Sequence, residues 1–302
     1  MKYSLKQIEV FDAIASQESV SAAARKLMMT QSAVSMSLSQ LENQLGRPLF
    51  SRQGNRLVLS HWGHWLRPKA RNLLNDARQI ESGLHDQHVI CGDLNICASQ
   101  TAAEHLIPEL ISKIDSDFPQ LQLHINVENT QTVIQRLLNF DVDLGVIEGR
   151  SDDTRLVTLP WVDDHLVIVG APEHPYANRA HVSVEQLAVA KWVLREPGAG
   201  TRRIFDGAIH GKIDKLNVWR EYEQVSILKA LVKGSSYLSA LPWLDVIDDI
   251  NSGELALITT PELDMQRSLS FIWRNDNNDN PLRECVLAQA KRLAKQKALN
   301  PC

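Results

Sequence analysis

The stretch from Ser19 to Leu45 contains two short helical patterns in direct succession, with almost no room for a connection. The small residues Ala22–Ala24 let two helices cross closely, and Ser21 and Thr30 stand where N-caps belong, since a hydroxyl accepts from an unpaired helical N–H. Apolar residues recur at helical spacing in the second pattern, at Val34, Leu38, Leu41 and Leu45. The stretch predicts a helix-turn-helix, whose second helix fits a DNA major groove. An ordinary helical hairpin has the same periodicity and is the alternative.

The flanking segments complete a small DNA-binding head. A first amphipathic helix closes a three-helix core with Leu5, Ile8, Phe11, Ile14 and Ala15. Gly46 and Pro48 stop the third helix, and alternating apolar residues around the turn pair Gly54–Asn55 predict a two-stranded wing. Arg52 and Arg56 flank this turn, within reach of phosphates or the minor groove. Solvated surface arginines are the alternative.

A long helix is expected from Ser60 to about Leu84, with Pro68 inside its early turns. Its apolar residues approximate a heptad seam, at Trp62, Leu66, Ala70, Leu73, Ala77, Ile80 and Leu84. A stripe on a helix without a neighbour in its own domain indicates pairing with a second copy of the chain. Packing against its own body is the alternative.

Beyond a hinge at 86–92 the pattern alternates between strands and helices, which predicts a parallel sheet. Strands are expected over 93–98, 121–127, 144–147, 165–170, 192–194, 216–219 and 269–273. Helices are expected over 101–117, 130–139, 224–233 and 282–297, with another after Gly200. The last strand and helix are expected to return to the first set of elements.

The formal net charge of -4 argues against nucleic-acid binding until its distribution is considered. Residues 1–90 hold 11 Lys and Arg against 7 Asp and Glu, so the excess of acid lies in the remaining 212 residues. This asymmetry favours a DNA-binding head on an acidic body. Four scattered cysteines indicate reduced thiols in a cytoplasmic protein. No apolar run approaches the ~18 residues of a membrane span, and no secretory signal is expected.

Many residues at fixed spacing carry a family resemblance. They are Leu5, Phe11, Ser21, Ala22, Ala23, Ala24, Leu27, Gln31, Ser32, Ala33, Val34, Ser35, Leu38, Leu41, Glu42, Leu45, Gly46, Leu49, Phe50 and Arg52. On them the chain resembles the LysR-type transcriptional regulators, over its first 90 residues and more loosely throughout. The resemblance implies an all-α winged helix-turn-helix domain and a long dimerising linker helix, joined to an α/β two-lobed effector domain like a periplasmic binding protein. It also implies a homotetramer.

The domains implied by this resemblance divide the chain at two places. They are a DNA-binding domain over 1–59, a linker helix and hinge over 60–89, and an effector-binding domain over 92–302. Within the last domain, lobe 1 comprises 92–163 and 267–302, and lobe 2 comprises 164–266.

On the same resemblance, Gln31, Ser32 and Ser35 open the recognition helix, where short polar groups suit base edges and phosphates. The expected DNA-binding residues are Ser21, Gln31, Ser32, Ser35, Met36, Arg52 and Arg56. An ordinary helix-surface serine is the alternative for Ser35. The chain departs from the family at Met36, Ser39, Gln40 and, in the linker, Trp62. Basic side chains are common at the first three positions, so we expect a modest salt dependence of DNA binding.

An effector is expected between the lobes, at strand ends and helix N-termini. Ser99–Thr101 follow the first strand of the body, where hydroxyls and free helical N–H groups suit an anion; simple N-capping is the alternative. The loop 195–202 contains two glycines that can form a concave backbone nest, and Thr201 opens a helix. Glu148 is expected to gate the cleft. The expected effector-binding residues are Ser99, Gln100, Thr101, Thr130, Glu148, Glu196, Gly198, Gly200, Thr201 and Arg202.

The loop 195–202 carries a finer resemblance, to the EPGSGTR segment of a LysR branch that includes Calvin-cycle and sulfite-responsive regulators. Ala199 replaces the serine, so one hydroxyl donor is missing. The resemblance implies a small inorganic oxyanion or a small carboxylate as co-inducer. No cofactor is expected, and no metal, since the histidines show no metal-ligand spacing. The segment 232–242 also resembles a second-lobe element of the family, in which Ser235 and Ser236 are interpreted as turn residues.

Three other functions compete. An enzyme is disfavoured because the ten histidines form no HExxH and the chain has neither a GxSxG elbow nor a P-loop. A solute-binding protein would share the two-lobed body but not the DNA-binding head. A DNA-binding regulator without a ligand fits the same motifs and stays open. The preferred prediction is a sequence-specific regulator that binds promoter DNA as a homodimer or homotetramer, contacts RNA polymerase, enters no membrane, and changes geometry when an anion binds.

Overall fold

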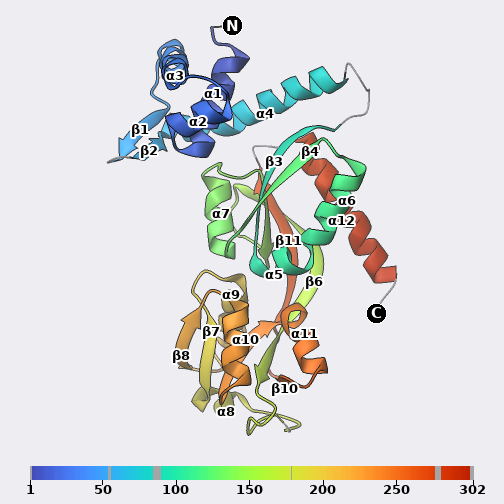
Figure 1. Ribbon diagram of the computed structural model, residues 1–302. Helices are drawn as coiled ribbons and strands as arrows, with labels where there is room; N and C mark the ends of the chain where they lie inside the picture. The colour runs from blue at the N-terminus through green and yellow to red at the C-terminus, as the bar shows by residue number, and fades with distance from the viewer. Residues whose placement is uncertain (1, 54–55, 84–89, 178, 276–279, 300–302) are drawn as a thin grey trace.

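The computed structural model describes residues 2–53, 56–83, 90–177, 179–275 and 280–299. A helical head lies at one end of an elongated body, and the helix α4 (His61–Gly83) runs between the head and the nearer half of the body (Figure 1). Among the described helices, none combines the length and the apolar run that a membrane crossing requires.

The head is built from three helices and a small antiparallel hairpin. They are α1 (Leu5–Gln17), α2 (Val20–Lys26), α3 (Gln31–Leu45), β1 (Phe50–Gln53) and β2 (Arg56–Leu59). A single apolar cluster fills the space between them, with Ile8, Phe11, Ile14, Ala23, Val34 and Leu41 almost completely buried. The predicted three-helix core and wing are therefore confirmed, while the turn pair Gly54–Asn55 lies outside the described residues.

Of the N-caps predicted for α2 and α3, the one for α3 is correct. Thr30 caps α3, accepting from the Ala33 amide at 3.2 Å, and Gly46 ends the helix at φ +67°. The prediction for Ser21 is wrong, because α2 begins one residue before it. Ser19 is extended and accepts from the Ala22 amide at 3.3 Å, while the Ser21 hydroxyl lies 3.0 Å from the Ser19 hydroxyl.

The apolar stripe on α4 divides between the head and solvent. Leu66 and Ala70 pack on the head core, as the alternative interpretation of the stripe expected. Trp62, Leu73 and Ile80 stay exposed on the same helix. Leu84 lies outside the described residues. Part of the stripe therefore remains available to a second copy of the chain.

Polar contacts fix α4 against the body in this structure. The Arg67 guanidinium lies 2.8 Å from the Asp141 carboxylate, and Arg71 bonds both Asp12 of the head at 3.1 Å and the Asp141 carbonyl at 3.2 Å. Burial and the neighbouring charge of Arg71 together lower the pKa of Arg67, against the effect of the nearby carboxylates.

The body contains a nine-stranded mixed sheet within its described residues, in the order β4-β3-β5-β11-β6-β9-β7-β8, with β10 also paired to β6. The strands are β3 (Gly92–Ala98), β4 (Leu121–Val127), β5 (Leu144–Glu148), β6 (Leu156–Gly170), β7 (Lys191–Arg195), β8 (Asn217–Tyr222), β9 (Tyr237–Pro242), β10 (Ala256–Ile258) and β11 (Gln266–Arg274). The prediction of a parallel sheet is correct for β3, β4 and β5 and for β7, β8 and β9. It is wrong for β6 and β11, which run antiparallel to their neighbours because they cross between the two halves in opposite directions.

The described helices cover both faces of this sheet. They are α5 (Gln100–His105), α6 (Ile107–Asp117), α7 (Thr130–Leu138), α8 (Val184–Val189), α9 (Gly200–Ile209), α10 (Val225–Lys233), α11 (Trp243–Asn251) and α12 (Pro281–Leu299). The single helix predicted over 101–117 is wrong, because the chain breaks at Leu106, where φ is -121°. Pro108 follows at the start of α6, and its ring cannot donate a helical hydrogen bond to the preceding turn.

Separate apolar cores define two lobes. Lobe 1 contains β3, β4, β5, α5, α6, α7 and α12, and lobe 2 contains β7 to β10 and α8 to α11, with β6 and β11 passing through both. Leu282, Val286 and Ala290 of α12 pack with Leu94 of β3, so the predicted return of the last elements is confirmed. The exact domain boundaries stay a prediction.

Candidate functional site

The first turns of α3 present a polar face to solvent. Gln31, Ser32, Ser35 and Met36 are exposed, whereas Val34 on the opposite face is completely buried. This is the arrangement that a helix needs to enter a groove while it remains anchored in its own domain.

The other residues predicted to bind DNA lie on α2 and on the two strands of the wing. Ser21 on α2 and Arg52 on β1 are exposed. Arg56 begins β2, but its side chain lies outside the described residues. Arg25 and Lys26 are also exposed, in the last turn of α2. Sequence reasoning did not single them out, although their charge in the basic head was a usable signal.

Four residues predicted to bind an effector converge at the boundary between the lobes. Glu148, at the end of β5, is 2% exposed, and its Oε1 accepts from the Thr101 hydroxyl at 3.1 Å. Its Oε2 accepts from the Thr201 amide at 2.7 Å and from the Thr201 hydroxyl at 2.8 Å. The Thr130 hydroxyl accepts from the Glu148 amide at 3.3 Å. The first turns of α5 and α9 thus donate to one buried carboxylate, and the first residue of α7 accepts from the backbone amide of the same glutamate.

Arg267 of β11 supplies the positive charge for this cluster. Its side chain is completely buried, and its Nη1 lies 2.9 Å from Glu148 while its Nη2 lies 2.6 Å from Asp164. Burial raises the pKa of the Glu148 carboxyl, but Arg267 and the Thr201 hydroxyl outweigh it, so the pKa lies below its usual value. Sequence reasoning missed Arg267 because no local motif marks it.

The loop 195–202 lies around the cluster, and several of its polar groups are already bonded. Glu196 pairs with Arg195 at 2.9 Å and accepts from the Asn129 side chain at 3.1 Å. Arg202 bonds Asp206 and Glu221. Gly198 has φ +100°, a conformation that favours glycine, and its carbonyl accepts from the Gln131 amide at 3.1 Å. The loop therefore joins the lobes, but Glu196 and Arg202 do not contribute to the central cluster.

The segment Ser99–Thr101 behaves differently from simple capping. Ser99 is buried and precedes α5, yet its hydroxyl makes no capping hydrogen bond. The Gln100 side chain donates to Glu104 at 2.8 Å. The capping alternative is therefore wrong for Ser99. Ser235, by contrast, bonds the Leu231 carbonyl and the Tyr237 amide, which confirms its interpretation as a turn residue.

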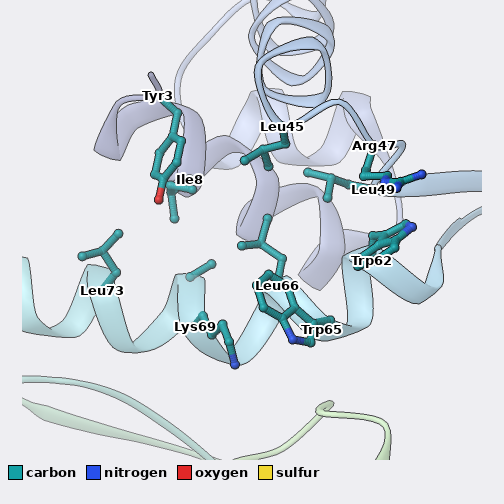
Figure 2. Close-up of a pocket in the computed structure, with 11 residues that line it drawn as sticks. Tyr3, Ile8, Leu45, Arg47, Leu49, Trp62, Trp65, Leu66, Lys69 and Leu73 are labelled. Carbon is teal, nitrogen blue, oxygen red and sulfur yellow. The ribbon is translucent and has the colours of Figure 1, made fainter. Parts of the chain in front are cut away.

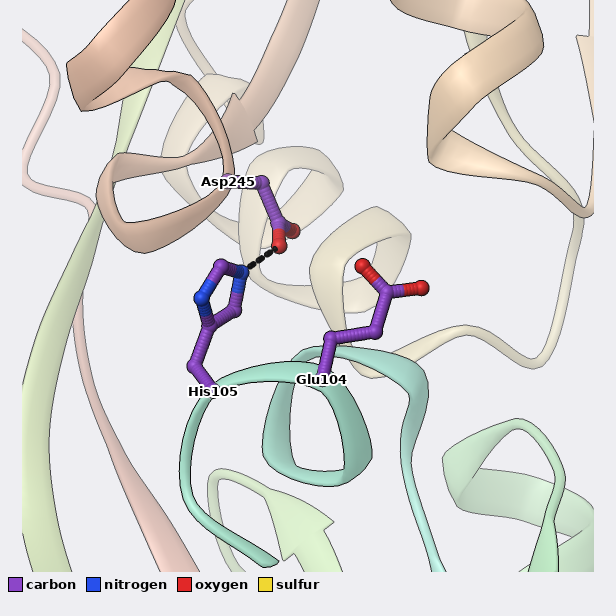
Figure 3. A group of neighbouring side chains, drawn as sticks. All are labelled: Glu104, His105 and Asp245. Carbon is purple, nitrogen blue, oxygen red and sulfur yellow. Dashed lines mark hydrogen bonds and ion pairs between the residues drawn. The ribbon is translucent and has the colours of Figure 1, made fainter. Parts of the chain in front are cut away.

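A second contact across the lobes joins α5 to α11 (Figure 3). His105 Nε2 lies 2.6 Å from Asp245 Oδ1. The single proton of the Thr101 hydroxyl is shared between Asp245 Oδ2, at 3.2 Å, and Glu148 Oε1. The hydrogen bond to Asp245 raises the pKa of His105 more than burial lowers it. Glu104 is exposed beside this pair. Sequence reasoning did not find Asp245, whose partners lie far away along the chain.

Comparison with known proteins agrees with this architecture. The model for the bacterial regulatory helix-turn-helix protein of the lysR family matches residues 5–64, and the LysR substrate binding domain model matches residues 87–295. The chain belongs to the LysR family of transcriptional regulators. It is 36% identical to the HTH-type transcriptional regulator YeiE of Escherichia coli, over 91% of each chain. It is 26% identical to the RuBisCO operon transcriptional regulator of Allochromatium vinosum, over 97% of this chain and 98% of that one.

The solved structures that resemble this LysR regulator share its fold. A full-length OxyR variant from Pseudomonas aeruginosa has a TM-score of 0.74 at 20% identity, covering 97% of this chain and 96% of that one. The regulatory domain of Synechocystis CcmR, in complex with 2-PG, has a TM-score of 0.62 at 20% identity, covering 67% of this chain and 97% of that domain. These findings confirm the predicted family, the winged head on a two-lobed body, and the class of function, a DNA-binding regulator with an effector domain. The roles of individual residues stay predictions.

Proposed function

We propose that this LysR regulator binds promoter DNA in the cytoplasm through α3, and that a small oxyanion or carboxylate bound between its lobes changes the geometry of its oligomer. The observation that carries the proposal is the set of donors at the lobe boundary. Thr101, the N-terminus of α9 at Thr201, and Arg267 converge on one point from separate elements. Such a set suits an anion because helical N–H groups, hydroxyls and a guanidinium all donate.

The names of related proteins support an anionic effector. One structural neighbour is a CcmR domain in complex with 2-PG, and another is a QuiR effector domain in complex with shikimate. CysL of Bacillus subtilis is 26% identical over 88% of this chain. We infer the same class of ligand here. The relatives are named as regulators, and we propose no enzymatic reaction.

The exposed part of α4 supports self-association. A groove of about 320 Å³ lies between the head and α4, with Trp62, Trp65 and Leu73 on the α4 side and Arg47 at its edge (Figure 2). Trp65 is 49% exposed. We propose that α4 of a second copy covers this apolar surface, which a monomer would leave in water. A dimer also brings two heads to the DNA. The second head adds contacts that compensate for the small number of basic side chains on each head.

The mechanism requires the effector to prefer one arrangement of the lobes. A ligand with equal affinity for two arrangements shifts neither, so the response depends on the difference in affinity. We propose that a change in lobe angle alters the distance between DNA-binding pairs, and with it the bend of the DNA and the contact with RNA polymerase.

The test combines calorimetry with footprinting of bound DNA. Sulfite, sulfate, shikimate and 2-phosphoglycolate are titrated into the full chain, and the footprint is measured with each anion at saturation. We expect saturable heat with at least one anion and a footprint that changes in length. Unchanged footprints with all of them would instead support a ligand-independent regulator, the second candidate.

A further inference from the structure

The donors at the centre of the cleft are already bonded within the chain. Glu148 receives one hydrogen bond on Oε1 from Thr101, while its Oε2 receives two from Thr201 and contacts Arg267. An ionised carboxylate accepts about four hydrogen bonds. The side chain of Glu148 thus occupies the position that a free anion would take.

Close packing leaves no space for an additional anion between Glu148 and the first turn of α9. A Cβ built on Gly200 would lie 2.5 Å from the Glu148 Cβ and 2.7 Å from the Thr130 hydroxyl. The first turn of α9 is therefore in contact with the end of β5. An incoming oxyanion can reach Thr201 only if Glu148 leaves.

One of the two hollows beside the cluster is unfavourable for a competing anion. It measures about 360 Å³, and carboxylates line it at Glu104, Glu128, Glu196 and Glu223, with Arg195 as its cation. The Arg195 charge is already paired with Glu196 at 2.9 Å. An anion in the hollow would therefore meet mainly negative charge.

Two buried donors beside the cluster nevertheless lack partners among the described residues. They are Nη1 of Arg195, a residue that is 4% exposed, and the hydroxyl of Ser99, which is 1% exposed. Burying an unpaired donor is energetically unfavourable. These unpaired groups would gain an acceptor if an oxyanion replaced Glu148 and shifted the local packing.

We infer that Glu148 is a built-in carboxylate ligand of the inter-lobe site, and that an anionic effector binds by displacing it. The inference rests on the proposed function, because it specifies how the same site responds. Glu148 joins Thr101 of lobe 1 to Thr201 of lobe 2, so its displacement breaks a contact that holds the lobes together. The lobe arrangement described here is then the effector-free one.

Chemical rescue tests the inference directly. Glu148→Ala removes the carboxylate and leaves its donors, and acetate has the size and charge to replace the missing group. We expect calorimetry on the full chain to show saturable acetate binding to E148A, at least tenfold tighter than to the native chain. Glu148→Gln should bind acetate no better than the native chain, because its amide still fills the site.

Glu173→Ala is the matched control, since it removes one exposed negative charge from lobe 2 without opening the cleft. We expect it to match the native chain. Equal acetate affinity in E148A, E173A and the native chain would overturn the inference.

Hydrogen exchange in the native chain provides a second readout if E148A fails to fold. Displacement predicts faster exchange over 99–105 and 200–205 as sulfite saturates its site. Saturable sulfite binding with unchanged protection would overturn the inference. Acetate rescue of E148A without any anion effect on the native footprint would uphold Glu148 as the carboxylate ligand of this site, but would remove both its displacement and the anionic effector of the proposed function. An anion-dependent footprint with no acetate rescue of E148A would uphold the anionic effector and overturn the role assigned to Glu148.

Discussion

Asp245 of lobe 2 bonds two side chains of α5 in lobe 1, His105 and Thr101. The His105 side chain is 32% exposed and Asp245 is 2% exposed, so the pair is partly screened by solvent. The pKa of His105 is raised above its ordinary value of 6.5. The contribution of the His105–Asp245 pair to lobe closure is therefore fully present below pH 6.5, and it is lost as the pH rises through the raised pKa of His105.

We predict that Asp245→Asn lowers the pKa of His105 toward its ordinary value. The amide removes the charge that favours the imidazolium, while burial still opposes it. NMR titration of the His105 ring proton measures this shift. Asp248→Asn, at an exposed position on the same helix, is the control and should leave the titration unchanged. A His105 titration that is identical in D245N and the native chain would show that the pair does not form in solution.

Residue by residue, the sequence predicted the cleft where hydroxyls follow strands. Thr101 and Thr201 were identified because each stands at a helix start, and both bond the predicted Glu148. Arg267 and Asp245 were missed because their partners lie on other elements, and only the fold brings them together. Buried charge partners carry no local sequence signal, whereas helix termini do.

At the scale of elements, the first turn of α9 determines how closely the lobes approach. We predict that Gly200→Ala destabilises the chain by ~1–3 kcal/mol, because its Cβ would overlap Glu148 and the overpacked contact must open. Urea denaturation measures the loss of stability. Gly207→Ala in the same helix is the control, since nothing lies within 4 Å of its Cβ. It should be neutral or stabilise the helix by up to ~1 kcal/mol. Equal effects of the two substitutions would contradict the close packing.

The recognition helix permits an equally direct prediction. Ser35→Glu places a negative charge on the exposed face of α3, where it would meet phosphates and base edges. We expect the loss of binding to a promoter fragment that the native chain retains in a gel-shift assay, with unchanged oligomer size. Gln44→Glu, exposed near the end of the same helix, adds the same charge and should keep most of the affinity. Retained binding by S35E would show that another face reads DNA.

Two element boundaries were predicted wrongly because apolar periodicity alone does not mark them. Helical spacing continues from 101 to 117, but Pro108 enforces a break that apolar periodicity does not register. The predicted strand 165–170 missed the first half of β6, which begins at Leu156. Pro160 and several polar residues interrupt the apolar pattern there. That half pairs with β11, so tertiary contacts override weak local propensity.

At the scale of the molecule, the order of strands and helices predicted two sets of elements and the return of the last strand to the first set, but not the antiparallel direction of that strand. Local order favours parallel neighbours, and β3, β4 and β5 follow it. β11 returns from lobe 2 to lie between β5 and β6, antiparallel to both. Two strands that cross the boundary give the lobes a shared hinge, and this arrangement is visible only in three dimensions (Figure 1).

Self-association is a property of the whole molecule, and a substitution on α4 can test it. Leu73 is 39% exposed, lines the groove between the head and α4, and is not part of the head core. We predict that Leu73→Asp weakens the dimer by at least tenfold, since burying a leucine contributes ~1.5–3 kcal/mol and each of two copies would lose it. Sedimentation velocity over a range of concentrations measures the dissociation constant.

The matched control for this prediction is Lys291→Asp, at an exposed position on α12. It introduces the same side chain away from α4 and should sediment like the native chain. Folding of L73D is checked by circular dichroism, and it should be retained because an aspartate in a helix costs only ~0.7 kcal/mol. If L73D dimerised as tightly as the native chain, the groove between the head and α4 would not be the contact between copies. The oligomer in which the lobe angle sets the distance between DNA-binding heads would then have to form through contacts of the body.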